Sequence, residues 1–91
     1  MPQPTWKPVE DPHEARSKLP DSAFAFPTRR AEPLLDAAHV RNALARFDQV
    51  EGVSDGDRAL AFENIRAAAA HFGVHVGETS WRDLMRPSGG G

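Results

Sequence analysis

The chain has 91 residues, a formal net charge of −2 and no cysteine. This length is enough for one domain with a thin core. The lack of cysteine excludes disulfides, zinc–thiolate sites, iron–sulfur clusters and a cysteine nucleophile within the chain. The slightly negative charge argues against DNA as the default partner, because dedicated nucleic-acid binders are usually basic.

Residues 1–18 combine prolines and charged residues with only two sizeable apolar side chains, Trp6 and Val9. Prolines restrict the backbone, and so little apolar surface does not offset the entropy lost on ordering. We therefore predict a disordered arm over residues 1–18. Within it, Trp6 is either solvated or loosely packed, or it anchors on the domain or on a partner.

Residues 19–33 contain two phenylalanines, Phe24 and Phe26, which lie two positions apart. In an extended segment, side chains two positions apart point to the same side. Pro20 and Pro27 limit this segment to an edge strand or an irregular extended stretch. We predict that both rings cover the helices that follow.

A first helix is predicted to begin after Asp36 and to fray near Gln49 or Val50. Asp is a preferred N-cap residue, since its carboxylate accepts hydrogen bonds from free backbone N–H groups. The apolar side chains that follow recur at helical spacing and form one stripe. They are Val40, Ala43, Leu44 and Phe47.

A second helix is predicted from Ser54 to Gly73. Ser54 is a favourable N-cap, and Asp57 three residues later makes an approximate capping box. Four consecutive alanines at 67–70 give strong helix propensity. Gly73 stands where a helix commonly ends in a left-handed residue.

A short third helix is predicted from Ser80 to Met85, followed by a flexible tail at residues 87–91. The predicted fold is therefore mainly all-α. A helical hairpin and a short third helix form a small domain over residues 19–86, with the aromatic extended segment packed across them.

The sequence contains no pattern typical of a catalytic centre. The glycine patterns that cradle phosphates and the turn that exposes a hydrolase serine are both absent. His71 and His75 have the spacing of two metal ligands, and His39 could approach them, but Gly73 should end the helix between that pair. We predict no metal site, no cofactor and no enzymatic activity; a metal-dependent activity at these histidines is the least favoured hypothesis.

Two groups of side chains are candidates for binding a partner. Trp6 and Trp81 could act as aromatic anchors, which often dominate protein–protein binding energy. The other group is a modest basic stripe near the first helix, able to contact phosphates; its members are Arg29, Arg30, Arg41 and Arg46. We favour a protein partner, with weak nucleic-acid association as the alternative.

Two stretches, 19–27 (LPDSAFAFP) and 36–47 (DAAHVRNALARF), resemble a family of small uncharacterised proteins of high-GC Gram-positive bacteria and their phages. The resemblance covers residues 19–84. Related modules occur as free-standing short proteins and as appendages on phage head-maturation proteins. A weaker resemblance links the layout to the ChaB group of small helical proteins. Neither resemblance implies catalytic or binding residues.

We therefore expect a non-enzymatic protein-interaction module located in the cytoplasm. No stretch is apolar for the ~20 residues that a membrane-spanning helix needs, so we expect no association with membranes. A monomer or a weak homo-oligomer is expected.

Overall fold

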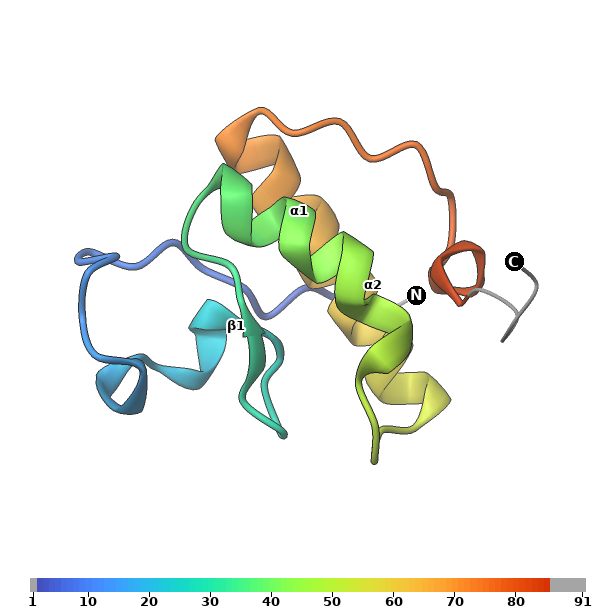
Figure 1. Ribbon diagram of the computed structural model, residues 1–91, viewed down its shortest axis with the longest axis horizontal. Coiled ribbons are helices and arrows are strands. Elements are labelled where there is room, and N and C mark those ends of the chain that lie inside the picture. Colours follow the sequence, from blue (N-terminus) through green and yellow to red (C-terminus); the bar gives the residue numbers. More distant parts are fainter. Residues whose placement is uncertain (1, 86–91) are drawn as a thin grey trace.

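A computed structural model describes residues 2–85, which form a mainly helical domain with one small sheet (Figure 1). The strands are β1 (Phe24–Phe26) and β2 (Ala31–Pro33), and the helices are α1 (Ala37–Arg46) and α2 (Asp55–Phe72). Short 3-10 turns cover Arg16–Lys18, Asp21–Ala23, Phe47–Gln49 and Trp81–Leu84. The predicted pair of main helices is confirmed, whereas the sheet was not predicted.

The two strands form an antiparallel hairpin that lies against both helices. β1 packs on α2, and β2 packs on α1. The chain reverses through residues 27–30 and leaves the turn with Arg30 at a φ of 50°. This left-handed conformation is uncommon for residues other than glycine. The register places Phe24 opposite Pro33 and Phe26 opposite Ala31.

Helix α1 begins as predicted, because Asp36 caps it. The Asp36 carboxylate accepts a hydrogen bond from the His39 backbone N–H at 2.8 Å and lies 2.7 Å from the His39 ring nitrogen Nδ1. After Arg46 the helix tightens into the 3-10 turn that ends at Gln49. The predicted end near Gln49 or Val50 is confirmed.

Helix α2 has the two ends that its sequence predicts. The Ser54 hydroxyl accepts the Asp57 backbone N–H at 3.1 Å, and the Asp57 carboxylate accepts the Ser54 N–H at 3.1 Å. This is a complete capping box. At the other end Gly73 adopts a φ of 73° and its N–H donates to the Ala69 carbonyl.

The main core lies between the helices and the hairpin. The rings of Phe26 and Phe47 are both almost fully buried and their centroids lie 5.4 Å apart. Phe24, by contrast, belongs to a second small cluster with Leu19 and Ala23. Only Phe26 therefore covers the helices as predicted. Phe24 is covered instead by the preceding segment, which folds back over β1.

The prediction that the arm is disordered is wrong over residues 2–18. Trp6 is only 8% exposed and belongs to the main core. The backbone N–H groups of Thr5 and Trp6 donate to the Asn64 side-chain oxygen at 2.7 and 2.9 Å. The arm has little apolar surface of its own, but Trp6 and the buried acceptor Asn64 on α2 attach it to residues far along the chain.

After Gly73 the chain crosses the molecule without regular structure and ends in the turn Trp81–Leu84 (Figure 1). The predicted third helix is therefore a single 3-10 turn. The Asp83 carboxylate accepts the backbone N–H groups of Thr79 and Ser80 at 3.1 and 3.3 Å, which closes the turn tightly. The predicted tail at 87–91 lies outside the described residues. Across residues 2–85, no helix has the length and apolarity needed to cross a membrane.

Candidate functional site

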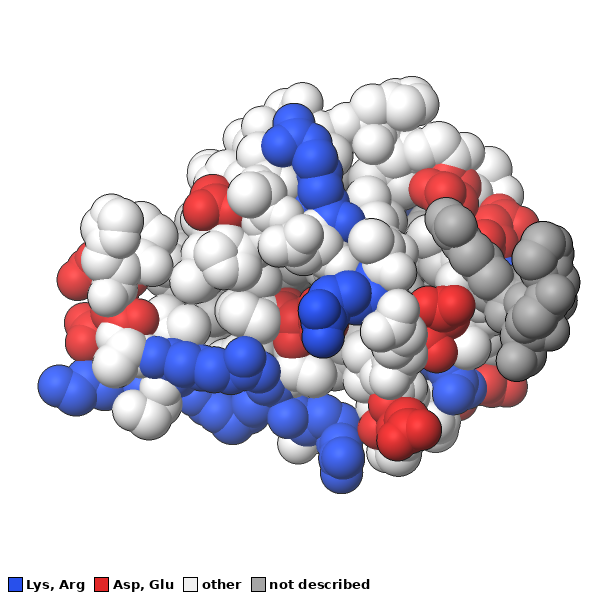
Figure 2. All heavy atoms as spheres, in the orientation of Figure 1, with Lys and Arg blue, Asp and Glu red and all other residues white. Residues whose placement is uncertain are grey.

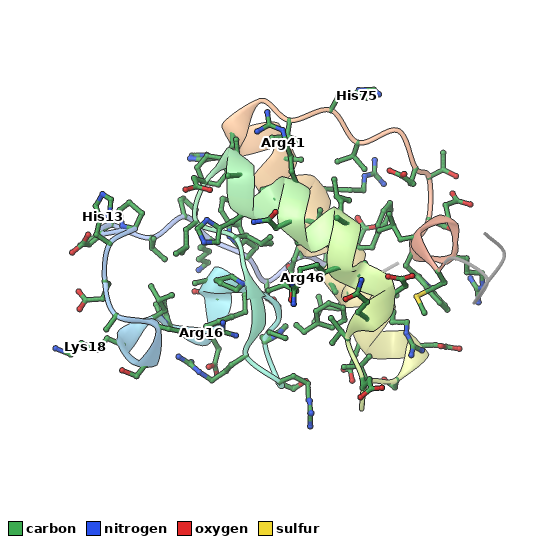
Figure 3. All side chains as sticks on the ribbon, in the orientation of Figure 1. His13, Arg16, Lys18, Arg41, Arg46 and His75 are labelled. Carbon is green, nitrogen blue, oxygen red and sulfur yellow. The ribbon has the colours of Figure 1, made fainter. Side chains whose placement is uncertain are left out.

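The four arginines of the predicted basic stripe do not lie in one row. Figure 3 shows Arg41 towards the N-terminal end of α1 and Arg46 farther along the helix, at a distance from it. Arg29 and Arg46 border the same shallow hollow of about 270 Å³, at the tip of the hairpin and the end of α1. Glu32 and Glu51 also line this hollow, so its charge is mixed.

Arg30 is committed to the fold. Its guanidinium donates to the Asp21 carboxylate at 2.6 Å and to the carbonyls of Leu19 and Arg16 at 2.8 and 3.0 Å. It also covers the Phe24 ring, 4.7 Å from the ring centroid. Arg30 thus holds the N-terminal segment to the hairpin and has little free capacity to bind a phosphate.

A basic edge of the molecule nevertheless exists, and it includes basic residues that were not part of the predicted stripe. Figure 2 shows Lys and Arg side chains gathered along the lower left of this face. Figure 3 places Arg16 there, near the hairpin, and Lys18 farther to the left. Arg16 donates to the Arg30 carbonyl at 2.7 Å. No local pattern in the sequence indicates this edge, because the fold brings Arg16 next to Arg30 across 14 positions of the chain.

The two tryptophans have different environments. Trp6 is in the core, where its ring nitrogen donates to the Leu34 carbonyl at 3.1 Å. Trp6 therefore serves the packing of the chain itself and is not exposed for a partner. Trp81 is only partly buried and packs at the margin of the core. Of the two predicted aromatic anchors, Trp81 is the one that reaches the surface.

Trp81 borders a hollow of about 290 Å³ between the last turn and α2. Phe62 and Ala59 of α2 supply apolar lining, and Pro2 of the arm closes one side. Glu63 and Arg82 add charge at its border. The hollow thus joins three parts of the chain: the arm, the middle of α2 and the last turn.

Two guanidinium groups lie over the Trp81 ring. Arg82 lies 4.5 Å from the ring centroid and Arg58 lies 5.8 Å from it. Arg58 also pairs with Asp55 at 2.7 Å, whereas Arg82 has no ion-pair partner within residues 2–85. Cations over an aromatic face are attracted by its quadrupole. The ring is therefore held in place beside an exposed positive charge.

The last turn is also fixed electrostatically. Hydrogen bonds from the backbone N–H groups of Thr79 and then Ser80 lower the pKa of Asp83 below its ordinary value, with a further contribution from the Thr79 hydroxyl. The carboxylate therefore stays ionised at neutral pH. Its hydrogen bonds stabilise the turn that contains Trp81.

The histidines considered as metal ligands make contacts in different parts of the structure. His39 pairs with Asp36 at the start of α1. His71 lies edge-on to Trp6 and to Phe72, with centroids 5.6 and 4.8 Å apart. Within the part of the chain that the structure describes, no three histidine or acidic side chains are grouped to hold a metal ion.

Sequence reasoning missed Asn64, the residue that organises the arm. It is fully buried, and its amide group bonds to Thr5, Trp6 and the Ala25 carbonyl. A signal was available, since Asn64 lies among the buried apolar positions of α2. A polar residue on a buried helical face requires hydrogen-bond partners from elsewhere in the fold.

Comparison with known proteins identifies a family. The model of a family of unknown function, DUF6582, matches residues 7–79. No curated protein and no solved structure matches the chain.

Proposed function

Because the chain belongs to the DUF6582 family, whose function is unknown, we propose a function from its own surface. The chain is a non-enzymatic module that binds another protein, and the partner docks on the hollow beside Trp81. The observation that carries this proposal is a partly exposed tryptophan whose ring contacts two guanidinium groups and borders a mainly apolar hollow.

The composition of this surface supports a protein partner. Tryptophan and arginine are the residues most enriched among those that dominate protein–protein binding. The hollow, at about 290 Å³, is at the lower end of the roughly 300–1,000 Å³ typical of small-molecule sites. It suits an apolar side chain from a partner, and Arg82 suits an acidic residue next to that side chain.

The proposal is tested by affinity capture from native-host lysate with and without nuclease, read out by mass spectrometry. The wild-type chain is compared with Trp81→Ala and with Arg41→Ala, a matched control on the exposed face of α1. We expect one nuclease-insensitive protein that Trp81→Ala loses and Arg41→Ala retains. Direct titration of the purified partner should then show affinity at least tenfold lower for Trp81→Ala. Equal capture by both variants would contradict the proposal.

Nucleic-acid association is the alternative function. The basic edge in Figure 2 supports it, and Arg29 of the hairpin turn and Arg46 of α1 are also exposed and border one hollow. Binding through such residues should weaken steeply as salt rises, because counterions are released from the phosphates. The test is filter binding of RNA and DNA over a salt series. The double change of Arg29 and Arg46 to Gln should abolish retention, and Arg41→Gln serves as the control.

The proposed setting is the cytoplasm, with the chain a monomer or a weak homo-oligomer. A cysteine-free domain of this size suits a reducing compartment, since small secreted domains usually rely on disulfides. The resemblance to small proteins of high-GC Gram-positive bacteria and their phages, some of them appended to larger proteins, supports a role in protein binding. Modules appended to larger proteins commonly work through contacts rather than catalysis.

A further inference from the structure

We infer that the groove on α2 that holds Thr5 and Trp6 is a recognition site for an extended segment, which the arm of a second copy of this chain also fills. The arm comprises residues 2–7, and the groove is formed by Asn64, Leu34, His71 and Phe72. Pro2 of the arm also lines the Trp81 hollow, but the residues that hold Thr5 and Trp6 do not, and the inference does not depend on a partner docking in that hollow.

Asn64 recognises the backbone of the arm. It is the only buried polar or charged side chain that the structure shows over residues 2–85. Its Oδ1 accepts the N–H groups of Thr5 and Trp6, and its Nδ2 donates to the Thr5 hydroxyl at 3.2 Å. Nδ2 also donates to the Ala25 carbonyl at 2.9 Å, which fixes the orientation of the amide. The two N–H groups of the arm thus supply the donors that this buried oxygen needs.

Trp6 supplies the second point of attachment. Its indole N–H donates to the Leu34 carbonyl, and its ring lies edge-on to His71 and Phe72 at 5.6 and 5.8 Å. Asn64 binds the backbone of the arm, and Leu34, His71 and Phe72 contact its large side chain. Together they fix the register of an extended segment without any covalent link to it.

The link between the arm and the rest of the domain is loosely attached. Residues 8–15 are exposed apart from Val9, which is half-buried. Their hydrogen bonds are local, such as Glu14 N–H to the Asp11 carbonyl at 3.1 Å, and within the described chain none joins them to the helices or the sheet. Within this link only Val9 packs on the domain, against the small cluster of Leu19, Ala23 and Phe24, and the chain is next held at Arg16, which bonds with Arg30. The arm is therefore a compact ligand on an eight-residue connection.

This arrangement satisfies the requirements for exchange between copies. An arm that enters the groove of a second chain makes the same contacts as in its own chain, so a closed dimer needs no new interface. The intramolecular arm has an effective concentration on the order of millimolar. The monomer therefore prevails in dilute solution, and exchanged dimers form when chains fold together at high concentration.

The first test uses the wild-type chain. It is unfolded in denaturant and refolded at concentrations from about 1 µM to about 1 mM, so that the upper limit reaches the effective concentration of the arm. Size-exclusion chromatography with light scattering then measures the mass. We expect a species of twice 10.0 kDa that increases with refolding concentration and is absent for Trp6→Ala. A folded monomer at every concentration, or a dimer that Trp6→Ala retains, overturns the inference.

The second test mixes two full-length variants. Trp6→Ala has an intact groove and a defective arm, and Asn64→Leu has an intact arm and a defective groove. When they are refolded together, native mass spectrometry should detect a heterodimer in excess of either homodimer. The double variant mixed with Trp6→Ala is the control and should give none. Absence of the heterodimer when both variants are helical by circular dichroism overturns the inference; if either is unfolded, the wild-type concentration series decides.

Discussion

Asn64 and Arg30 each join several backbone groups from distant segments. Asn64 connects α2 to the arm and to β1, across 58 or more positions to the arm and 39 to the strand. Arg30 connects the hairpin turn to the 3-10 turns that precede β1. A charged or amide side chain with several backbone acceptors or donors contributes more than a surface ion pair alone. These two residues therefore fix how the N-terminal third of the chain packs.

Replacing Arg30 with Gln should destabilise the domain, although Arg30 is a charged residue near the surface. The change removes hydrogen bonds to two carbonyls and the cover over Phe24. We expect the free energy of unfolding to fall by about 1–2 kcal/mol. Urea denaturation followed by circular dichroism measures it. Arg29→Gln, at the neighbouring exposed position, is the control and should change stability by less than about 0.5 kcal/mol; equal effects would contradict the role given to Arg30.

At the scale of elements, both helices depend on side chains at their N-terminal ends. Asp36 caps α1, and the reciprocal pair of Ser54 and Asp57 caps α2. The hydrogen bond from the His39 backbone N–H, followed by that from the His39 ring, lowers the pKa of Asp36 below its ordinary value of 3.8. A carboxyl group with a lowered pKa stabilises the folded state only while it is ionised.

The contribution of Asp36 should therefore depend on pH. Its folded-state pKa is below its unfolded-state pKa, so its stabilising effect is complete above the unfolded value and is lost as pH falls through the folded one. Asp36→Ala should lower the free energy of unfolding by about 1 kcal/mol at pH 7. Denaturation curves recorded from pH 7 to below the ordinary value should show this difference shrinking. Asn is a cap without a titrating group, so the stabilisation by Asp36→Asn at this position should not change over the same pH range.

The contact between the hairpin and the end of α1 depends on two rings. Phe26 and Phe47 are each about 1% exposed. Phe47→Ala should lower the free energy of unfolding by about 3 kcal/mol, from lost apolar burial and the cavity left behind. Thermal melting measures the effect, with Leu44→Ala as a half-buried comparison that should cost less. An unchanged melting temperature for Phe47→Ala would contradict the observed core.

At the scale of the whole molecule, the arm belongs to the same packed body as the helices. Trp6 is part of the main core together with Phe26, Ile65 and Leu84. The domain is small and its total stability should be only a few kcal/mol, about 5. Loss of one contact in the shared core should therefore destabilise the arm and the helices together.

This predicts a single unfolding transition that includes the arm. The chain has two tryptophans, so Trp81→Phe leaves Trp6 as the only tryptophan fluorophore. Its fluorescence should change at the same denaturant concentration as the far-ultraviolet circular dichroism of the helices, as expected for two-state unfolding. Fluorescence change at clearly lower denaturant would mean that the arm detaches before the helices unfold.

The sequence predicted the helices well because their signals are local. Asp36, Ser54 with Asp57, and Gly73 mark helix ends through contacts within a few residues, and the structure shows each of them. The arm and the hairpin depend on contacts between distant positions. Trp6 needs Leu34 and Asn64, and no local pattern in residues 1–18 shows that these partners exist. Among the candidate site residues, Trp81 is a prediction that the sequence alone allows, while the basic edge with Arg16 depends on the fold.

The segment between Gly73 and the last turn makes the molecule open to limited proteolysis. Residues 75–78 form no backbone hydrogen bond within the described chain, and their side chains alternate between exposed and half-buried. An endoprotease needs an extended substrate with free backbone groups, and such segments are cut first. One cut there would separate the Trp81 turn from α2 while leaving both helices, the hairpin and the arm in one fragment.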